Sequence, residues 1–160
     1  MNKIRIGFGY DVHRLVGGRE LWLGGIRLPY HMGLEGHSDA DVLIHALCDG
    51  ILGAANLRDI GFHFPDKDAE YKNIDSKILL AQTMELLRTE GFELGNVDIT
   101  VIAEAPKLNP YIPQMKTCLA EVMRVKEADI SIKATTSEKI GFVGREEGLA
   151  AYASVLIYKD

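Results

Sequence analysis

The sequence predicts a single α+β domain over residues 1–160, in which a mixed β-sheet carries helices on one face and a small hairpin lies near the N-terminus. Segments with the two-residue period of strands alternate with segments of helical period, in the order strand, helix, strand, helix, strand, strand. No internal repeat, linker or composition shift divides the chain, and 160 residues suffice for one hydrophobic core.

The first strand and the hairpin are predicted from alternation and glycine. Apolar side chains recur at every second position from Ile4 to Tyr10, which is the period of a half-buried strand. Residues 20–23 and 26–29 flank Gly24 and Gly25, and this dipeptide permits the positive φ angles of a tight hairpin turn.

Helical periodicity follows from residue 38. Ser38 opens the pattern with Asp41 three positions later, as in a capping box, and an apolar stripe runs from Leu43 to Ala54. The long polar segment 56–73 is predicted to be a loop, and loops of that length are often functional. The later patterns predict helices over about residues 76–90 and 112–125 and strands over residues 97–103, 129–134 and 149–158.

Composition excludes several classes of protein. The formal charge is −5, and no run of basic residues occurs, which disfavours binding to nucleic acid or to an anionic membrane surface. The two cysteines, Cys48 and Cys118, lie far apart without CxxC spacing, so we expect reduced thiols. No segment resembles a signal peptide or a membrane helix, and a cytoplasmic location is therefore predicted.

Asp11, His13 and His45 are candidate metal ligands. Asp11 and His13 are two residues apart in a strand and point to the same side, and His45 lies on the polar face of the first helix. One carboxylate and two imidazoles would leave one position of a tetrahedral Zn²⁺ open. Asp49, one turn after His45, is a candidate partner for its imidazole. The alternative is that these residues merely end a strand and line a helix face.

Two further segments are suited to phosphates or hydroxyl groups. Free N–H groups at the entrance of the first helix attract anions, and His37 could add a donor there, although Ser38 could equally be a simple N-cap. The acidic segment from Asp59 to Asp68 could accept hydrogen bonds from sugar hydroxyls or bind a divalent ion, although it could equally be a solvated loop.

The C-terminal third contains two more candidates. Residues 134–139, followed by Gly141 and Arg145, combine hydroxyls, a carboxylate, a guanidinium and glycines that suit phosphates, or form a polar turn. The rigid segment from Ala105 to Pro110 offers backbone groups that could read a base edge, or is an ordinary loop.

Together these segments resemble the 2-C-methyl-D-erythritol 2,4-cyclodiphosphate synthase family along essentially the whole chain. Several long motifs in the same order are far more specific than one short fingerprint. The motifs are Asp11-Val-His13, Gly36-His-Ser-Asp-Ala-Asp-Val-Leu-Ile-His45, Asp59-Ile-Gly61, Phe64-Pro-Asp-Lys-Asp68, Ala105-Pro-Lys107 and Ala134-Thr-Thr-Ser-Glu-Lys-Ile-Gly-Phe-Val-Gly-Arg145. Arg58 stands where the family commonly has glycine, and Ser137 differs from common variants.

The resemblance implies a homotrimeric enzyme of the non-mevalonate isoprenoid pathway with active sites between subunits. It implies a phosphorus–oxygen lyase that cyclises 4-diphosphocytidyl-2-C-methyl-D-erythritol 2-phosphate to the 2,4-cyclodiphosphate and releases CMP. Zn²⁺ would bind Asp11, His13 and His45, and a second cation, Mg²⁺ or Mn²⁺, would bind with help from Glu138. His37 and Thr136 match the family's transition-state stabilisers.

The resemblance also implies the substrate contacts. The acidic segment would hold hydroxyl groups of the substrate, and residues 103–109 would cradle cytosine. Phe142 and Arg145 would lie near the axis of the trimer and border a cavity that accepts isoprenoid diphosphates. The full set is Asp11, Val12, His13, His37, Ser38, Asp59, Ile60, Gly61, Phe64, Pro65, Asp66, Lys67, Asp68, Ala103, Glu104, Ala105, Pro106, Lys107, Leu108, Asn109, Thr135, Thr136, Ser137, Glu138, Phe142 and Arg145.

Two rival classes differ in their products. A trimeric nucleotide-binding or isoprenoid-sensing module would leave the substrate intact. A metal-dependent phosphohydrolase would use water in place of the internal phosphate and release a linear product. Retention of the ligand set and of Thr136 and Glu138 favours the synthase over the binding module.

Overall fold

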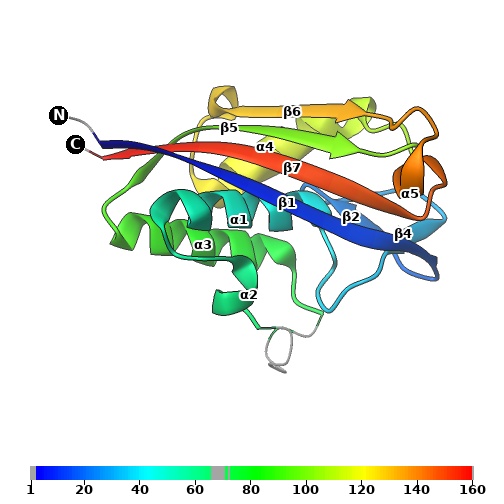
Figure 1. The fold of residues 1–160 in the computed structure, drawn as a ribbon, viewed down its shortest axis with the longest axis horizontal. Helices are drawn as coiled ribbons and strands as arrows, with labels where there is room; N and C mark the ends of the chain where they lie inside the picture. The colour runs from blue at the N-terminus through cyan, green and yellow to red at the C-terminus, as the bar shows by residue number, and fades with distance from the viewer. Residues whose placement is uncertain (1–2, 66–70, 72, 160) are drawn as a thin grey trace.

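The main sheet of the computed structural model contains five strands, β1 (Lys3–Gly17), β4 (Met32–Leu34), β5 (Glu93–Ile102), β6 (Ile130–Thr135) and β7 (Gly148–Lys159). The structure describes residues 3–65, 71 and 73–159. The strands lie in the order β4-β1-β7-β5-β6 (Figure 1). Strands β5 and β6 are parallel, whereas every other neighbouring pair is antiparallel. The predicted mixed sheet is confirmed.

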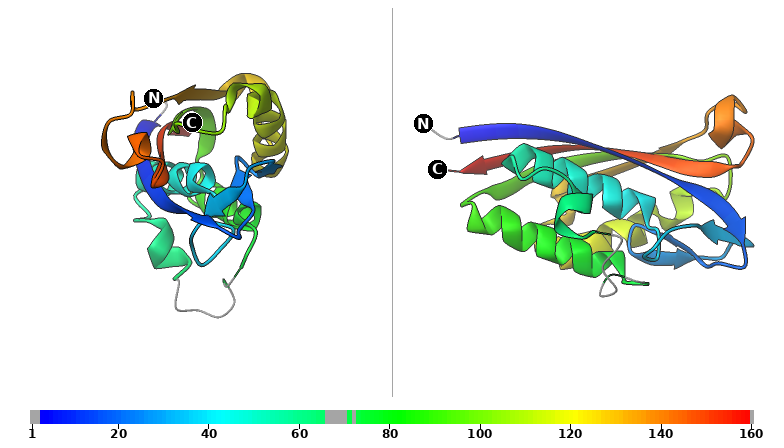
Figure 2. Two further views of the ribbon diagram at one scale, coloured as in Figure 1. Left: turned by 90° about the vertical axis from the view of Figure 1, so that its right-hand side faces the viewer. Right: turned by 60° about the horizontal axis from the view of Figure 1, so that its bottom comes forward.

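The longest helices are α1 (Val42–Ala55), α3 (Ser76–Thr89) and α4 (Ile112–Met123). They lie on the same side of the sheet, as predicted (Figure 2), and one buried cluster of side chains joins them to it. No helix in the described part of the chain is long and apolar enough to cross a membrane. The short helical segments are α2 (Ile60–His63), α5 (Gly141–Gly144), η2 (Asn109–Tyr111) and η3 (Glu127–Asp129).

The predicted hairpin is confirmed as strands β2 (Leu21–Leu23) and β3 (Ile26–Leu28), with positive φ at both Gly24 and Gly25. Strand β4 and the short helical segments α2, α5, η2 and η3 were not predicted. Strand β4 has three residues, too few to show a period, and it pairs with the end of β1. Helix α2 has four residues and lies inside the segment predicted as a loop.

Strand β1 buries the opposite face from the one its apolar pattern predicts. Ile6 is 80% exposed and Phe8 64% exposed, whereas Gly7 and Gly9 face helix α1. A Cβ built on Gly9 would lie 1.8 Å from the carbonyl oxygen of Ala46, so only glycine allows the helix to lie directly on the strand. The apolar side chains therefore face outward, on the side of the sheet away from the helices.

Helix α1 begins three residues later than the capping-box pattern predicts. Its N-cap is Asp41, whose carboxylate accepts a hydrogen bond from the backbone N–H of Ile44. The same carboxylate accepts from the N–H groups of Gly24 and Gly25, and it is fully buried. Asp41 thus joins the start of the helix to the hairpin, and Ser38 lies in the turn before the helix.

Candidate functional site

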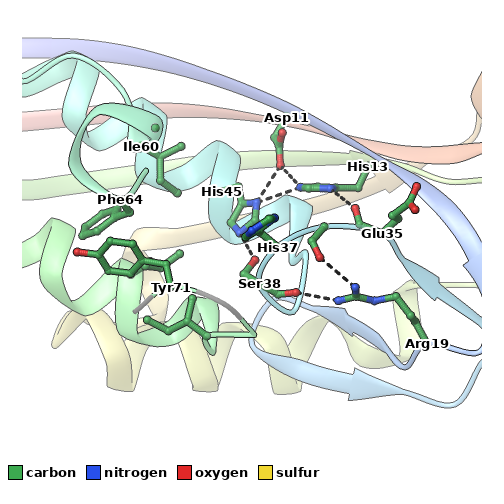
Figure 3. Close-up of a pocket in the computed structure, with 14 residues that line it drawn as sticks. Asp11, His13, Arg19, Glu35, His37, Ser38, His45, Ile60, Phe64 and Tyr71 are labelled. Carbon is green, nitrogen blue, oxygen red and sulfur yellow. Dashed lines mark hydrogen bonds and ion pairs between the residues drawn. The ribbon is translucent and has the colours of Figure 1, made fainter. Parts of the chain in front are cut away.

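Asp11, His13 and His45 converge where β1 crosses the first turn of α1 (Figure 3). Asp11 Oδ2 lies 3.0 Å from His13 Nε2 and 3.1 Å from His45 Nδ1, and the two ring nitrogens are 3.1 Å apart. The alternation of β1 turns both of its residues towards the helix, and the glycines before them bring the helix close. The predicted cluster is therefore present.

The cluster fits a tetrahedral metal ion. Ligand atoms at zinc bond lengths of about 2.0–2.2 Å would lie about 3.3 Å apart, close to the three observed separations. His13 Nδ1 lies 2.7 Å from the carbonyl oxygen of Glu35, which can only accept a hydrogen bond, so Nδ1 carries the proton. His13 Nε2 then presents its lone pair to the point that Asp11 and His45 also face.

Charge within the cluster shifts two pKa values. Burial alone would raise the pKa of Asp11, but hydrogen bonds and charge from His13 and His45 outweigh it and lower the pKa to about 2. Burial alone would lower the pKa of His13, but its hydrogen bond to Asp11 and the Asp11 charge raise it. Asp11 is therefore a carboxylate at neutral pH, and a metal must compete with a proton for His13.

A cavity of about 640 Å³ adjoins the cluster. Among the predicted site residues that line it are Asp11, His13, His37, Ser38, His45, Ile60, Gly61 and Phe64. Its volume is in the range of small-molecule sites. The structure thus brings the helix entrance and part of the acidic segment to the metal candidates.

Asp59 caps helix α2 through the N–H of Phe62 and sets Ile60 and Gly61 at the cavity wall. Arg58 has φ of 72°, a conformation that favours glycine, which accounts for the glycine common in the family. Pro65 follows Phe64, and the predicted contacts Asp66, Lys67 and Asp68 lie outside the described residues.

A second group of predicted residues surrounds a separate cavity of about 380 Å³. The Glu104 carboxylate accepts hydrogen bonds from the backbone N–H groups of Ser137 and Lys139, which joins the segment after β5 to the segment after β6. Thr136 Oγ1 lies 3.2 Å from Glu138 Oε1. The predicted residues that line this cavity are Ala103, Glu104, Pro106, Lys107, Leu108, Asn109, Thr135 and Thr136.

The two cavities have no lining residue in common within the described chain. Several described residues of the predicted set line neither of them: Val12, Asp59, Pro65, Ala105, Ser137, Glu138, Phe142 and Arg145. Val12 is exposed on the outer face of β1, and Phe142 and Arg145 lie at α5, where Arg145 pairs with Glu147. In the described part of the chain, the metal candidates and the predicted cytosine segment therefore line different cavities.

Sequence reasoning missed Ser76 and Arg19 beside the cluster, and the structure gives Asp49 a different partner from the predicted one. Asp49 accepts a hydrogen bond from the N–H of Ile60 at 2.7 Å, and it is Ser76 Oγ that lies 2.9 Å from His45 Nε2. Arg19 donates to the carbonyl oxygens of Gly36 and Ser38. Ser76 opens the second predicted helix and Arg19 precedes the hairpin, so no local pattern indicated either contact.

The fold and the cluster define an α+β protein with a candidate divalent-metal centre beside a cavity for a small molecule. The sequence profile of the YgbB family matches residues 4–158, and the chain belongs to this family.

Named relatives agree with this assignment. A protein of Parabacteroides distasonis named 2-C-methyl-D-erythritol 2,4-cyclodiphosphate synthase is 71% identical over 157 residues, 98% of each sequence. The bifunctional IspDF from Campylobacter jejuni has a TM-score of 0.96 and 45% identity. The match covers 100% of the present chain and 43% of the bifunctional chain. The CDP complex of IspF from Plasmodium falciparum has a TM-score of 0.87 and 34% identity, with 100% and 99% of the two chains covered. The family resemblance is confirmed.

Proposed function

We propose that this chain converts 4-diphosphocytidyl-2-C-methyl-D-erythritol 2-phosphate to 2-C-methyl-D-erythritol 2,4-cyclodiphosphate and CMP, as a phosphorus–oxygen lyase of non-mevalonate isoprenoid biosynthesis. The observation that carries the proposal is the convergence of Asp11, His13 and His45 beside a cavity, in a chain 71% identical to a relative with that synthase name.

The reaction needs no nucleophile from the protein. An oxygen of the substrate's own 2-phosphate attacks the β-phosphorus and forms a new P–O bond, while the P–O bond to CMP breaks and CMP leaves with the electron pair. The protein has to bend the substrate so that these groups meet, which removes much of the entropic barrier. His37 and Thr136 would donate hydrogen bonds to the charge that develops on the phosphates.

Two cations complete this proposal. Asp11, His13 and His45 would hold Zn²⁺, since their donor atoms and spacing suit it. Glu138 would contribute to a site for Mg²⁺ or Mn²⁺. When bound, such cations offset the negative charge of the phosphates and polarise them.

The substrate would span both cavities. Residues beside the cluster would hold the phosphates, with Ser38 at the entrance of α1, and the segment from Asp59 to Gly61 would hold hydroxyl groups. Residues 103–109 would read cytosine through backbone groups, with Thr135 and Lys107 near the phosphates. Since these two sets line separate cavities among the described residues, that part of a single chain does not offer one continuous site.

We therefore propose a homotrimer in which each active site combines the metal candidates of one subunit with the second cavity of the next. Exposed apolar side chains on the outer face of β1 and β7 support an interface there, because a contiguous patch of this kind marks an interaction surface. The patch comprises Ile4, Ile6, Phe8, Tyr10, Val12, Tyr152 and Tyr158. Phe142 and Arg145 would then approach the axis, where an isoprenoid diphosphate could bind.

Incubation with the cytidylyl substrate and Mg²⁺, followed by ³¹P NMR with and without a zinc chelator, tests the proposed reaction. The expected result is a cyclic diphosphate together with CMP, both lost on chelation. Linear phosphate products would assign a phosphohydrolase, and intact substrate would assign a binding module; either result would overturn the proposal.

A further inference from the structure

The second ring nitrogen of His45 is held by a pair of side chains, Ser76 and Asp39. His45 Nε2 lies 2.9 Å from the hydroxyl oxygen of Ser76, which is fully buried. The Ser76 hydroxyl donates to Asp39 Oδ1, and the Ser76 backbone N–H donates to Asp39 Oδ2 at 3.0 Å. The chain of contacts therefore runs from the Asp39 carboxylate through Ser76 to the imidazole.

This chain fixes where the imidazole proton lies. A serine hydroxyl has one proton to donate, and here the proton goes to the Asp39 carboxylate, which can only accept. The Ser76 oxygen therefore accepts towards His45 and draws the imidazole proton to Nε2, in competition with the Asp11 carboxylate 3.1 Å from Nδ1. The lone pair is then on Nδ1, the atom that faces Asp11 and His13.

We propose that Asp39 and Ser76 are positioning residues that hold His45 in the tautomer competent to bind a metal through Nδ1. The inference rests on the metal site of the proposed function. Contacts beyond the ligands commonly set the tautomer and orientation of a metal-binding histidine. Asp49, which the sequence offered for this role, is bonded to the Ile60 N–H.

The backbone anchors this pair. The N–H of Asp39 donates to the carbonyl of Ile74 at 3.1 Å, and the N–H of Asn73 donates to the carbonyl of His37 at 2.6 Å. These bonds hold the turn before α1 against the segment that leads into α3. Asp39 and Ser76 are thus brought together by the same backbone contacts that shape the cavity wall.

Ser38 makes the role of the pair testable. Its hydroxyl oxygen accepts from the N–H of Ala40 at 3.0 Å and lies 3.2 Å from His45 Nε2. With Ser76 replaced by alanine, the Ser38 hydroxyl can turn its proton to Nε2. His45 would then carry its proton on Nδ1 and donate it to Asp11, in the place a metal would take.

Long-range ¹H–¹⁵N NMR of the metal-free protein at neutral pH reads the tautomer of His45 directly. Wild type should show a protonated Nε2 and an unprotonated Nδ1. Asp39→Asn keeps the size of the side chain, but its amide donates to the Ser76 oxygen and frees the serine proton for Nε2, so the tautomer should invert. Ser76→Ala should show the same inversion.

Zinc affinity, measured by competition with a chelating dye, supplies the second readout. Both variants should bind zinc about 10–100-fold more weakly than wild type. Thr83→Val is the matched control, because Thr83 is another buried hydroxyl residue of α3 and its hydroxyl has no hydrogen-bond partner among the described residues; the zinc affinity and the His45 tautomer of this variant should match wild type. Circular dichroism confirms that each variant folds.

The outcomes separate this inference from the proposed function. A wild type with Nδ1 protonated, or variants that keep both the wild-type tautomer and the wild-type zinc affinity, would overturn the positioning role. A wild type that binds no zinc would overturn the proposed metal site, whatever the tautomer measured in the metal-free protein.

Discussion

Replacing Gly9 with alanine should separate β1 from α1 and so disturb the metal candidates. The added Cβ would lie 1.8 Å from the carbonyl oxygen of Ala46 and 2.7 Å from the backbone nitrogen of Gly50. Both atoms belong to the backbone and cannot rotate away. Strand and helix must therefore part by about 1 Å, and His45 precedes Ala46 in the same helix.

The size of the effect follows from this clash. Overpacking of a core typically destabilises by about 1–3 kcal/mol, and we expect about 3 kcal/mol here because the contact is with backbone. That loss lowers Tm by about 6–12 °C for a chain of this length. A shift of His45 by about 1 Å would also spread the three donor atoms, so zinc affinity should fall.

Gly53→Ala provides the matched control. Gly53 lies in the same helix, is exposed, and a Cβ there meets nothing within 4 Å. Because alanine favours a helix interior, this variant should be more stable by about 0.5–1 kcal/mol. Thermal unfolding by circular dichroism at equal protein concentration measures both, and a Gly9→Ala variant as stable as wild type would refute the packing argument.

Three other predictions follow from the site and the outer sheet face. Because the hydrogen bond and charge of Asp11 raise the pKa of His13, zinc affinity should fall on acidification as this ring takes up a proton; constant affinity on acidification would contradict the assignment. Phe8→Glu places a charge on the outer sheet face, so size-exclusion chromatography with light scattering should find monomers; persistent trimers would place the interface elsewhere. Thr136→Ala should slow product formation by about 10²-fold at unchanged zinc affinity, and a parallel loss of zinc would assign Thr136 to the metal site instead.

The sequence predicted what local periods and turns encode. The alternation around Asp11 and His13 placed both on one side of β1, and Gly24-Gly25 marked the hairpin. The apolar pattern of β1 predicted burial of the wrong face. The apolar side chains of β1 point outward, and its glycines face helix α1. Which face is buried depends on how closely α1 approaches Gly9, a contact between segments far apart in the chain.

The start of α1 and the partner of His45 could not be predicted for the same reason. Ser38 and Asp41 have the spacing of a capping box, yet Asp41 caps the helix because it also binds the hairpin. Asp49 has the helical spacing from His45, yet the imidazole meets Ser76 of another helix. Local spacing predicted which residue types matter, and long-range packing decided their partners.

The central claim is that the metal candidates and the second cavity act together across a subunit boundary, and mixed trimers of His45→Ala and Thr136→Ala test it most directly. The two variants are coexpressed with different tags, trimers that carry both tags are purified, and formation of the cyclic diphosphate is followed by ³¹P NMR. In a cyclic trimer that contains both kinds of subunit, one site in three combines the intact metal candidates of a Thr136→Ala subunit with the intact second cavity of a His45→Ala subunit. The rate should therefore be about one third of wild type. Activity no higher than that of either variant alone would contradict the shared site.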